Sequence, residues 1–189
     1  KNFTDWQYLN LNYVVKANIH QDLCIKCGRC HISHGLVDDE VVTWIKYAIV
    51  REDPSQDDYL FELVNRVDPE IIVSGIGEQP AIAHLNSFGV NSFTSGCVCV
   101  APCLSMEMLQ ALKNGNLEVA DSIRQTFEPL EDLRNAINPI RVLHAAVAGA
   151  GIADTGPILP FLDEVEDDSR EKIARAAKEL LTYNESVVM

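Results

Sequence analysis

A run of β-branched and aromatic residues, VVTWIKYAIV at positions 41–50, carries one cation, Lys46, near its middle. The run is too continuously apolar for a strand with one solvent-exposed face, so it predicts a strand buried on both faces, as in parallel sheets. Side chains alternate along a strand, which places Lys46 on the same face as Trp44 and Ala48. We therefore expect its ammonium to point between apolar neighbours rather than into water.

A lysine held in this way favours nucleophilic chemistry. Desolvation disfavours the charged ammonium and leaves the neutral amine available to attack a carbonyl carbon. The alternative is a lysine at the end of the strand whose amine reaches solvent, and from the spacing alone this structural role is the commoner one.

The composition limits the possible partners. The chain has 189 residues, of which 47% are hydrophobic, and a formal net charge of −13. This apolar content suffices for one domain, or for a domain with a small appendage. The acidic excess argues against nucleic acid or an anionic membrane as partner, because phosphate binding needs clustered lysine and arginine. No apolar run approaches the roughly 20 residues of a membrane span and no signal peptide is visible, so we expect a soluble cytoplasmic protein.

Three cysteines, Cys24, Cys27 and Cys30, stand at C-x-x-C-x-x-C spacing. With Gly28 allowing the backbone to curl, thiolates at this spacing are typical of an iron–sulfur cluster loop. A zinc knuckle, or cysteines without a metal, are the alternatives. The bacterial pattern has a fourth cysteine where this chain has His34. A second group of cysteines could complete the site, namely Cys97, Cys99 and Cys103. A C-x-C beside a strand end, however, more often packs as small apolar side chains.

Strand and helix patterns alternate after a boundary near residues 31–38. Three βα units are expected, with strands at 41–50, 71–74 and 89–94 and helices at 55–67, 80–88 and 104–113. Their short links imply parallel strands with right-handed crossovers. Further helices are expected at 117–133, 139–150 and 169–181. The predicted organisation is a cysteine segment (1–34), an α/β unit (38–115) and a helical region (116–189).

This order of elements resembles the dihydrodipicolinate synthase and N-acetylneuraminate lyase family from about residue 38 to 181. The similarity rests on the strand ends IK at 45–46, VSG at 73–75 and GVNSFT at 89–94, and on NGNL at 114–117 and NPI at 138–140. The resemblance implies an α/β fold that is the last three βα units of a (β/α)₈ TIM barrel with a C-terminal helical extension. It also implies homo-oligomers that need no cofactor.

By position, the family resemblance makes Lys46 the amine that forms a Schiff base with a pyruvate-type keto acid, and it puts Gly75 and Asn91 in the substrate pocket. A whole barrel needs about 250 residues, and the family's proton-relay tyrosine and Thr-Thr pair belong to earlier strands. Tyr47 faces away from Lys46 and does not replace that tyrosine. We therefore expect a truncated or joined product with little activity on its own.

The first 32 or so residues resemble the ferredoxin-like segment of dihydropyrimidine dehydrogenase. LNLNY at 9–13, NIHQD at 18–22 and the cysteine loop carry this similarity. It implies a 4Fe–4S cluster on Cys24, Cys27 and Cys30, and an alternative function as an iron–sulfur electron-transfer segment. The flavin and cofactor domains of that family have no counterpart in the sequence.

Overall fold

The computed structural model describes residues 44–158, 160 and 162–188 of the chain. The ferredoxin-like segment 1–34, with Cys24, Cys27 and Cys30, therefore lies outside the described residues. No helix in the described part is both long enough and apolar enough to cross a membrane.

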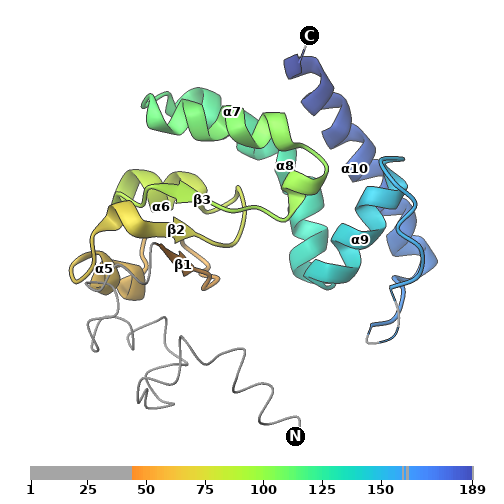
Figure 1. Cartoon of the computed structure of the whole chain (residues 1–189), viewed down its shortest axis with the longest axis horizontal. Helices are drawn as coiled ribbons and strands as arrows, with labels where there is room; N and C mark the ends of the chain where they lie inside the picture. Colours follow the sequence, from red (N-terminus) through yellow and green to blue (C-terminus); the bar gives the residue numbers. More distant parts are fainter. Residues whose placement is uncertain (1–43, 159, 161, 189) are drawn as a thin grey trace, which may run out of the picture.

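Three short parallel strands form the sheet (Figure 1). They are β1 (Ile45–Tyr47), β2 (Ile72–Ser74) and β3 (Ser92–Phe93), in the order β1-β2-β3. Lys46 pairs with Val73, which in turn pairs with Ser92. The parallel βα pattern is as predicted, but all three strands are shorter than expected. β1 takes up three of the described residues 44–50, β2 starts one residue later than the predicted 71–74, and β3 has two residues in place of 89–94.

The prediction that β1 is buried on both faces is wrong for the described residues. Ile45 and Tyr47 are buried, whereas Lys46 is exposed and Trp44 is 53% exposed. One face of β1 packs into a hydrophobic cluster with Leu60 of the following helix. No helix or strand that the structure describes packs on the other face, which carries Lys46. The side chains on that face therefore stay exposed among the described residues.

The described residues also form six α-helices and two short 3₁₀ turns. The helices are α5 (Asp58–Val64), α6 (Ala81–Phe88), α7 (Pro102–Lys113), α8 (Leu117–Ala136), α9 (Pro139–Gly149) and α10 (Asp167–Val188), and the turns are η1 (Pro69–Ile71) and η2 (Cys97–Cys99). Of these, α5, η1 and α6 lie between the strands and the others follow β3. Compared with the prediction, α5 is shorter and α10 is longer at both ends.

Local sequence signals explain where the late helices begin. Asn116 caps α8 by accepting the N–H of Val119, at 3.4 Å. Asn138 caps α9 by accepting the N–H groups of Ile140 and Arg141, at 3.1 and 3.0 Å, and Pro139 occupies the first turn, where its missing N–H costs nothing. The NGNL and NPI motifs are therefore helix-start signals.

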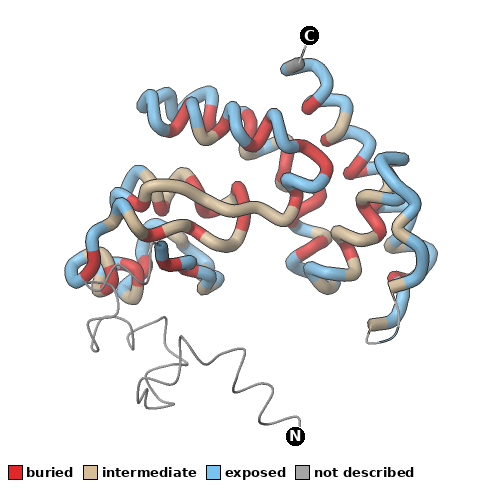
Figure 2. The backbone as a smooth tube through the Cα atoms, viewed as in Figure 1, coloured by how far each residue is buried: buried red, intermediate tan, exposed pale blue. Residues whose placement is uncertain are grey.

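Two hydrophobic clusters hold these elements together (Figure 2). The smaller one joins β1 and β2 to α5 through Ile45, Ile72 and Leu60. The larger one joins α7, α8, α9 and α10, with the fully buried Phe127 of α8 among its members. The second cluster runs across the expected division at residue 115, because α7 packs against α8.

Phe127→Ala is expected to lower the free energy of unfolding by about 3–5 kcal/mol, because it leaves a cavity among packed helices. Phe61→Ala removes the same ring from a side chain that is 61% exposed and should change stability by less than about 0.5 kcal/mol. Urea denaturation measures both changes. Equal effects would contradict the assignment of the larger cluster as the core.

A buried carboxylate ties the start of α5 to β1. Asp57 caps α5 by accepting the N–H groups of Tyr59 and Leu60, at 3.0 and 3.1 Å. It also accepts the hydroxyl of Tyr47 and pairs with Arg51, whose Nε is 3.2 Å from Oδ2. Burial disfavours the ionised form, but the hydrogen bonds from Tyr47, Leu60 and Arg51 outweigh it and hold the pKa of Asp57 below its usual range.

Asp57→Asn is expected to lower the free energy of unfolding at neutral pH by about 1–2 kcal/mol, because asparagine can still cap the helix but loses the ion pair with Arg51 and the charge that strengthens the hydrogen bond from Tyr47. Because the folded-state pKa of Asp57 is depressed, its contribution is present above the ordinary aspartate pKa of 3.8 and is lost as the pH falls through the folded-state pKa. The variant should therefore lose less stability than the wild type on acidification. Urea denaturation at several pH values measures this, with exposed Asp58→Asn as control, and parallel curves for wild type and Asp57→Asn would contradict it.

Candidate active site

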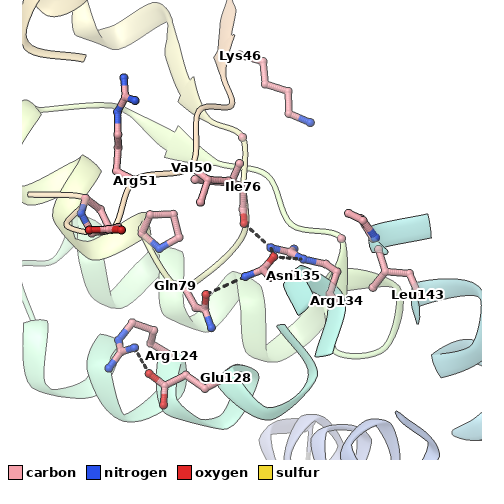
Figure 3. Close-up of a pocket in the computed structure, with 16 residues that line it drawn as sticks. Lys46, Val50, Arg51, Ile76, Gln79, Arg124, Glu128, Arg134, Asn135 and Leu143 are labelled. Carbon is pink, nitrogen blue, oxygen red and sulfur yellow. Dashed lines mark hydrogen bonds and ion pairs between the residues drawn. The ribbon is translucent and has the colours of Figure 1, made fainter. Parts of the chain in front are cut away.

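A cleft of about 510 Å³ opens where the strands end and the loops that follow them meet α8 and the start of α9 (Figure 3). Its walls combine apolar side chains with charged and amide groups. Lys46 lies at one end and the Arg124–Glu128 pair of α8 at the opposite end. This is the edge of a parallel sheet where ligands are commonly bound.

Lys46 passes directly over the bare backbone of Gly75. A Cβ placed on Gly75 would lie 2.6 Å from both Cγ and Cε of Lys46 and 2.8 Å from the carbonyl oxygen of Tyr47. Contacts that short do not occur, so glycine is required here if the lysine is to keep its place. Among the described residues, Lys46 has no hydrogen-bond or ion-pair partner.

The other cations of the cleft wall are neutralised. Arg51 pairs with Asp57 and lies over the ring of Tyr59, 5.0 Å from its centroid. Arg124 is 2.8 Å from Asp121 and also contacts Glu128. Arg134 pairs with Glu131 at 3.2 Å. Of the cations that line this cleft in the described part of the chain, Lys46 alone is free to meet a ligand.

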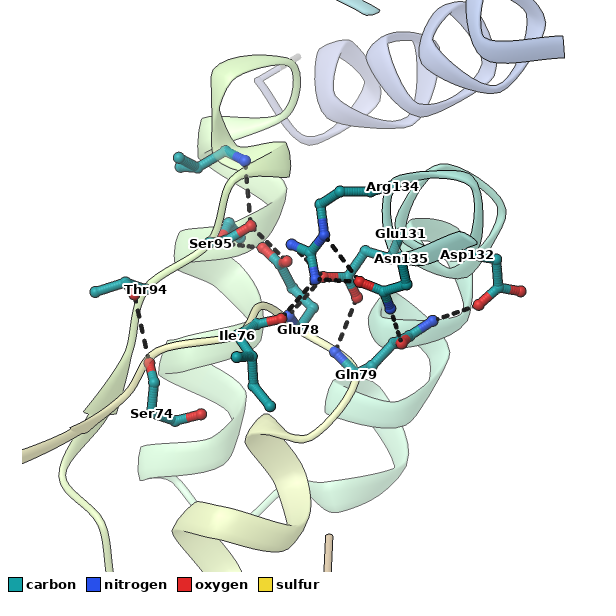
Figure 4. A network of polar contacts seen from close by, with 12 residues as sticks. Ser74, Ile76, Glu78, Gln79, Thr94, Ser95, Glu131, Asp132, Arg134 and Asn135 are labelled. Carbon is teal, nitrogen blue, oxygen red and sulfur yellow. Dashed lines mark hydrogen bonds and ion pairs between the residues drawn. The ribbon is translucent and has the colours of Figure 1, made fainter. Parts of the chain in front are cut away.

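The loop after β2 is fixed by α8 (Figure 4). Nη2 of Arg134 donates to the carbonyl of Ile76 at 2.6 Å. The carboxylate of Glu131 accepts the N–H groups of Glu78 and Gln79, at 3.2 and 2.9 Å. These contacts join residues more than 50 positions apart, so α8 sets the path of the loop beside Lys46.

Two carboxyl groups are buried together in this region. Glu78 and Glu131 are both fully buried, and the Ser95 and Ser105 hydroxyls donate to Glu78 at 2.5 and 2.7 Å. Burial raises the pKa of both carboxyls, and the neighbouring Glu78 raises the pKa of Glu131 further, against the opposing charge of Arg134. One guanidinium and two carboxyls favour keeping one proton on the pair.

The structure brings together two of the three residues predicted to form the active site. Lys46 and Gly75 touch, as described above. Asn91 instead lies just before β3, at the other end of the strand from the cleft. Its amide donates to the carbonyl of Glu70 at 3.0 Å, and its Oδ1 lies 3.4 Å from the amine of Lys113. Its assignment to the substrate pocket has no support in this geometry.

The cysteines of the described part do not form a metal site. Cys97 is buried, while Cys99 and Cys103 are exposed. No group of three or more histidine, cysteine, aspartate or glutamate side chains is arranged for a metal among residues 44–158, 160 and 162–188. The 4Fe–4S cluster on Cys24, Cys27 and Cys30 lies outside this part and stays a prediction.

The sequence reasoning missed Glu78, Glu131 and Arg134. A signal existed in α8, whose buried apolar positions include Phe127 and Leu130. Glu131 lies four residues after Phe127, and Arg134 four after Leu130, so both share the buried face of the helix. Charged residues in phase with an apolar face indicate a buried ion pair.

Comparison with known proteins gives a consistent picture. Residues 40–180 match the dihydrodipicolinate synthetase family. A 4-hydroxy-tetrahydrodipicolinate synthase of Methanopyrus kandleri is 37% identical over 115 residues, which are 60% of this chain and 37% of that protein. The chain thus spans well under half the length of this relative.

Solved structures show the same fold. The dihydrodipicolinate synthase of Oceanobacillus iheyensis superposes with a TM-score of 0.62 and 25% identity, over 77% of this chain and 51% of that one. The Bacillus clausii enzyme gives a TM-score of 0.61 and 24% identity, over 72% and 46%. The described α/β unit therefore resembles part of a TIM barrel. Since the family match extends over most of the sequence, the chain belongs to the dihydrodipicolinate synthetase family.

Proposed function

We propose that this chain carries the Schiff-base half-reaction of a lyase or synthase that acts on pyruvate-type 2-keto acids, with Lys46 as the nucleophile. The observation that carries the proposal is the position of Lys46, which lies over Gly75 without a partner among the described residues, in a cleft whose arginines are all paired. Membership of the family supports the same reaction class. Homo-oligomeric assembly is part of the proposal.

The chemistry begins with the neutral amine of Lys46 attacking the keto carbon. The resulting carbinolamine loses water to give an iminium, which withdraws electrons from the adjacent carbon. Loss of a proton from that carbon gives an enamine that can add to an aldehyde, or the reverse sequence cleaves the carbon–carbon bond. Hydrolysis of the iminium returns the free amine.

The described part of the cleft offers few side chains that could transfer protons in this reaction. The acid–base side chains that line the cleft there are Glu52 and Glu128, and no tyrosine, histidine or serine from the described part lines it. Glu128 is moreover engaged by Arg124. A general acid or base contributes typically 10²–10⁴-fold to a rate, as an order of magnitude. We therefore propose that the chain forms the iminium but turns over slowly.

Incubation with pyruvate and borohydride should reduce the iminium to a stable secondary amine on Lys46. Peptide mass spectrometry locates the adduct, since the reduced bond survives digestion. Lys46→Met should abolish the adduct, because the nucleophile is gone. Lys113→Met serves as control, because Lys113 lies outside the cleft near Asn91, and it should trap as the wild type does. An adduct spread equally over surface lysines, or none at all, would overturn the proposal.

Gly75→Ala tests the contact that positions the amine. The added methyl group has no room beside Cγ and Cε of Lys46 or the carbonyl of Tyr47, so the lysine must leave its place. We expect the rate of borohydride trapping to fall by roughly a hundredfold, the cost of a displacement of about 1 Å at a reacting atom. Gly115→Ala is the matched control, because a Cβ on that glycine meets nothing within 4 Å. Its positive φ of 72° costs some stability, but trapping by the folded protein should be unchanged, whereas equal losses would contradict the role of Gly75.

A further inference from the structure

The loop 75–79 begins with Gly75, against which the stem of Lys46 rests. The N–H of Gly75 donates to the carbonyl of Tyr47 at 2.6 Å, which continues the parallel pairing of β1 and β2 by one residue. The N–H of Gly77 donates to the carbonyl of Thr94 at 3.1 Å, beyond the end of β3. The sheet thus holds the loop at two points.

Helix α8 holds the same loop at three further backbone groups. Arg134 binds the carbonyl of Ile76, and Glu131 binds the N–H groups of Glu78 and Gln79. A planar guanidinium and a carboxylate are charged partners, which form stronger and more directional hydrogen bonds than neutral groups do. The two side chains also pair with each other at 3.2 Å, so each restricts the other.

The fit between loop and helix leaves no spare room. Gly77 has a φ of +108°, a conformation that favours glycine. A Cβ on Gly77 would lie 1.9 Å from Oε1 of Glu131. The loop therefore approaches the carboxylate as closely as a backbone without a side chain can.

Neighbouring side chains restrict Glu78 and Arg134 to one hydrogen-bonding geometry. Glu78 receives the hydroxyls of Ser95 and Ser105, so its carboxyl is directed away from the loop toward the segment after β3 and toward α7. At the outer edge, Asn135 accepts from Nε and Nη2 of Arg134 at 3.2 and 3.1 Å and donates to Gln79 at 3.2 Å. The polar groups are satisfied in one geometry, which is how buried networks specify a structure.

We propose that Glu131 and Arg134 are positioning residues for Lys46: they hold the loop 75–79 in the one path that keeps Gly75 under the lysine stem, and so they set where the amine meets the keto carbon. The role rests on the proposed function, although neither side chain takes part in bond making. The buried ion pair is thereby a determinant of reaction rate in addition to stability.

The test compares Glu131→Gln and Arg134→Lys with the wild type in the full chain. Glutamine retains an oxygen acceptor of the same shape, and lysine retains the charge but lacks the planar fork. We expect the rate constant for borohydride trapping at saturating pyruvate to fall by roughly tenfold to a hundredfold in each. The pyruvate concentration that gives half the maximal rate should change little, since neither residue binds the keto acid.

Asp121→Asn is the control. Asp121 is on the same helix, is also paired with an arginine, and has no contact with the loop. It should trap at the wild-type rate. Asn135→Ala is the least disruptive variant, because Asn135 is exposed. It removes the hydrogen bonds that Asn135 accepts from Arg134 but leaves the ion pair between Arg134 and Glu131 intact. Asn135→Ala should fold normally, and its rate constant for borohydride trapping should fall less than that of Arg134→Lys.

Two readouts do not depend on the keto acid. Amide exchange of the peptide containing residues 75–79 reports loop order. Reductive methylation with formaldehyde gives the reactivity of Lys46 relative to Lys113. Both should change in Glu131→Gln, Arg134→Lys and Asn135→Ala, and neither in Asp121→Asn.

The outcomes separate the two proposals. If the wild type forms no pyruvate adduct while the methylation ratio still depends on Glu131 and Arg134, the proposed function fails and the positioning role stands. If folded variants trap pyruvate at the wild-type rate, or leave the Lys46 to Lys113 ratio unchanged, the positioning role is overturned. A loss of trapping that matches the unfolded fraction would also overturn it.

Discussion

The contact between the stem of Lys46 and the bare backbone of Gly75 is the constraint on which the site depends. Parallel pairing sets Lys46 beside Val73 and Tyr47 beside Ser74, and one further hydrogen bond brings the N–H of Gly75 to the carbonyl of Tyr47. The lysine side chain then crosses the position that a Cβ would fill. Any change in the path of the loop is therefore passed directly to the amine.

The buried charges beside this contact are an expensive way to hold a loop. A buried ion pair often contributes little net stability, because desolvation offsets the attraction, yet removing one partner typically costs about 3–5 kcal/mol. Glu78 and Glu131 add a second difficulty, since two carboxyls share one guanidinium, Arg134. The arrangement instead supplies directional hydrogen bonds that fix the loop backbone. Three backbone groups of one loop receive charged partners that tolerate little displacement.

The sequence pattern predicted the order of the elements, and the family resemblance placed Lys46 and Gly75 in one site. Their contact across the ends of β1 and β2 became visible only in the structure. The sequence reasoning overestimated the burial of Lys46, because alternation along a strand states which residues share a face and says nothing about what covers that face. It placed Asn91 in the pocket by family position, whereas the short β3 begins one residue later and leaves that side chain at the far end. It missed Glu131 and Arg134, since their partners lie more than 50 residues away in the loop.

The exposure of Lys46 changes the physical account of its reactivity. Burial between apolar neighbours was the expected source, but water reaches the side chain in the described part of the chain. Orientation is then the effect that remains: the stem lies against Gly75, and no described carboxylate competes for the amine. Correct placement of reacting groups can contribute on the order of 7–11 kcal/mol toward a barrier, which exceeds the usual effect of one general acid or base. A cleft that positions an amine well and moves protons poorly would form the covalent adduct and release it slowly.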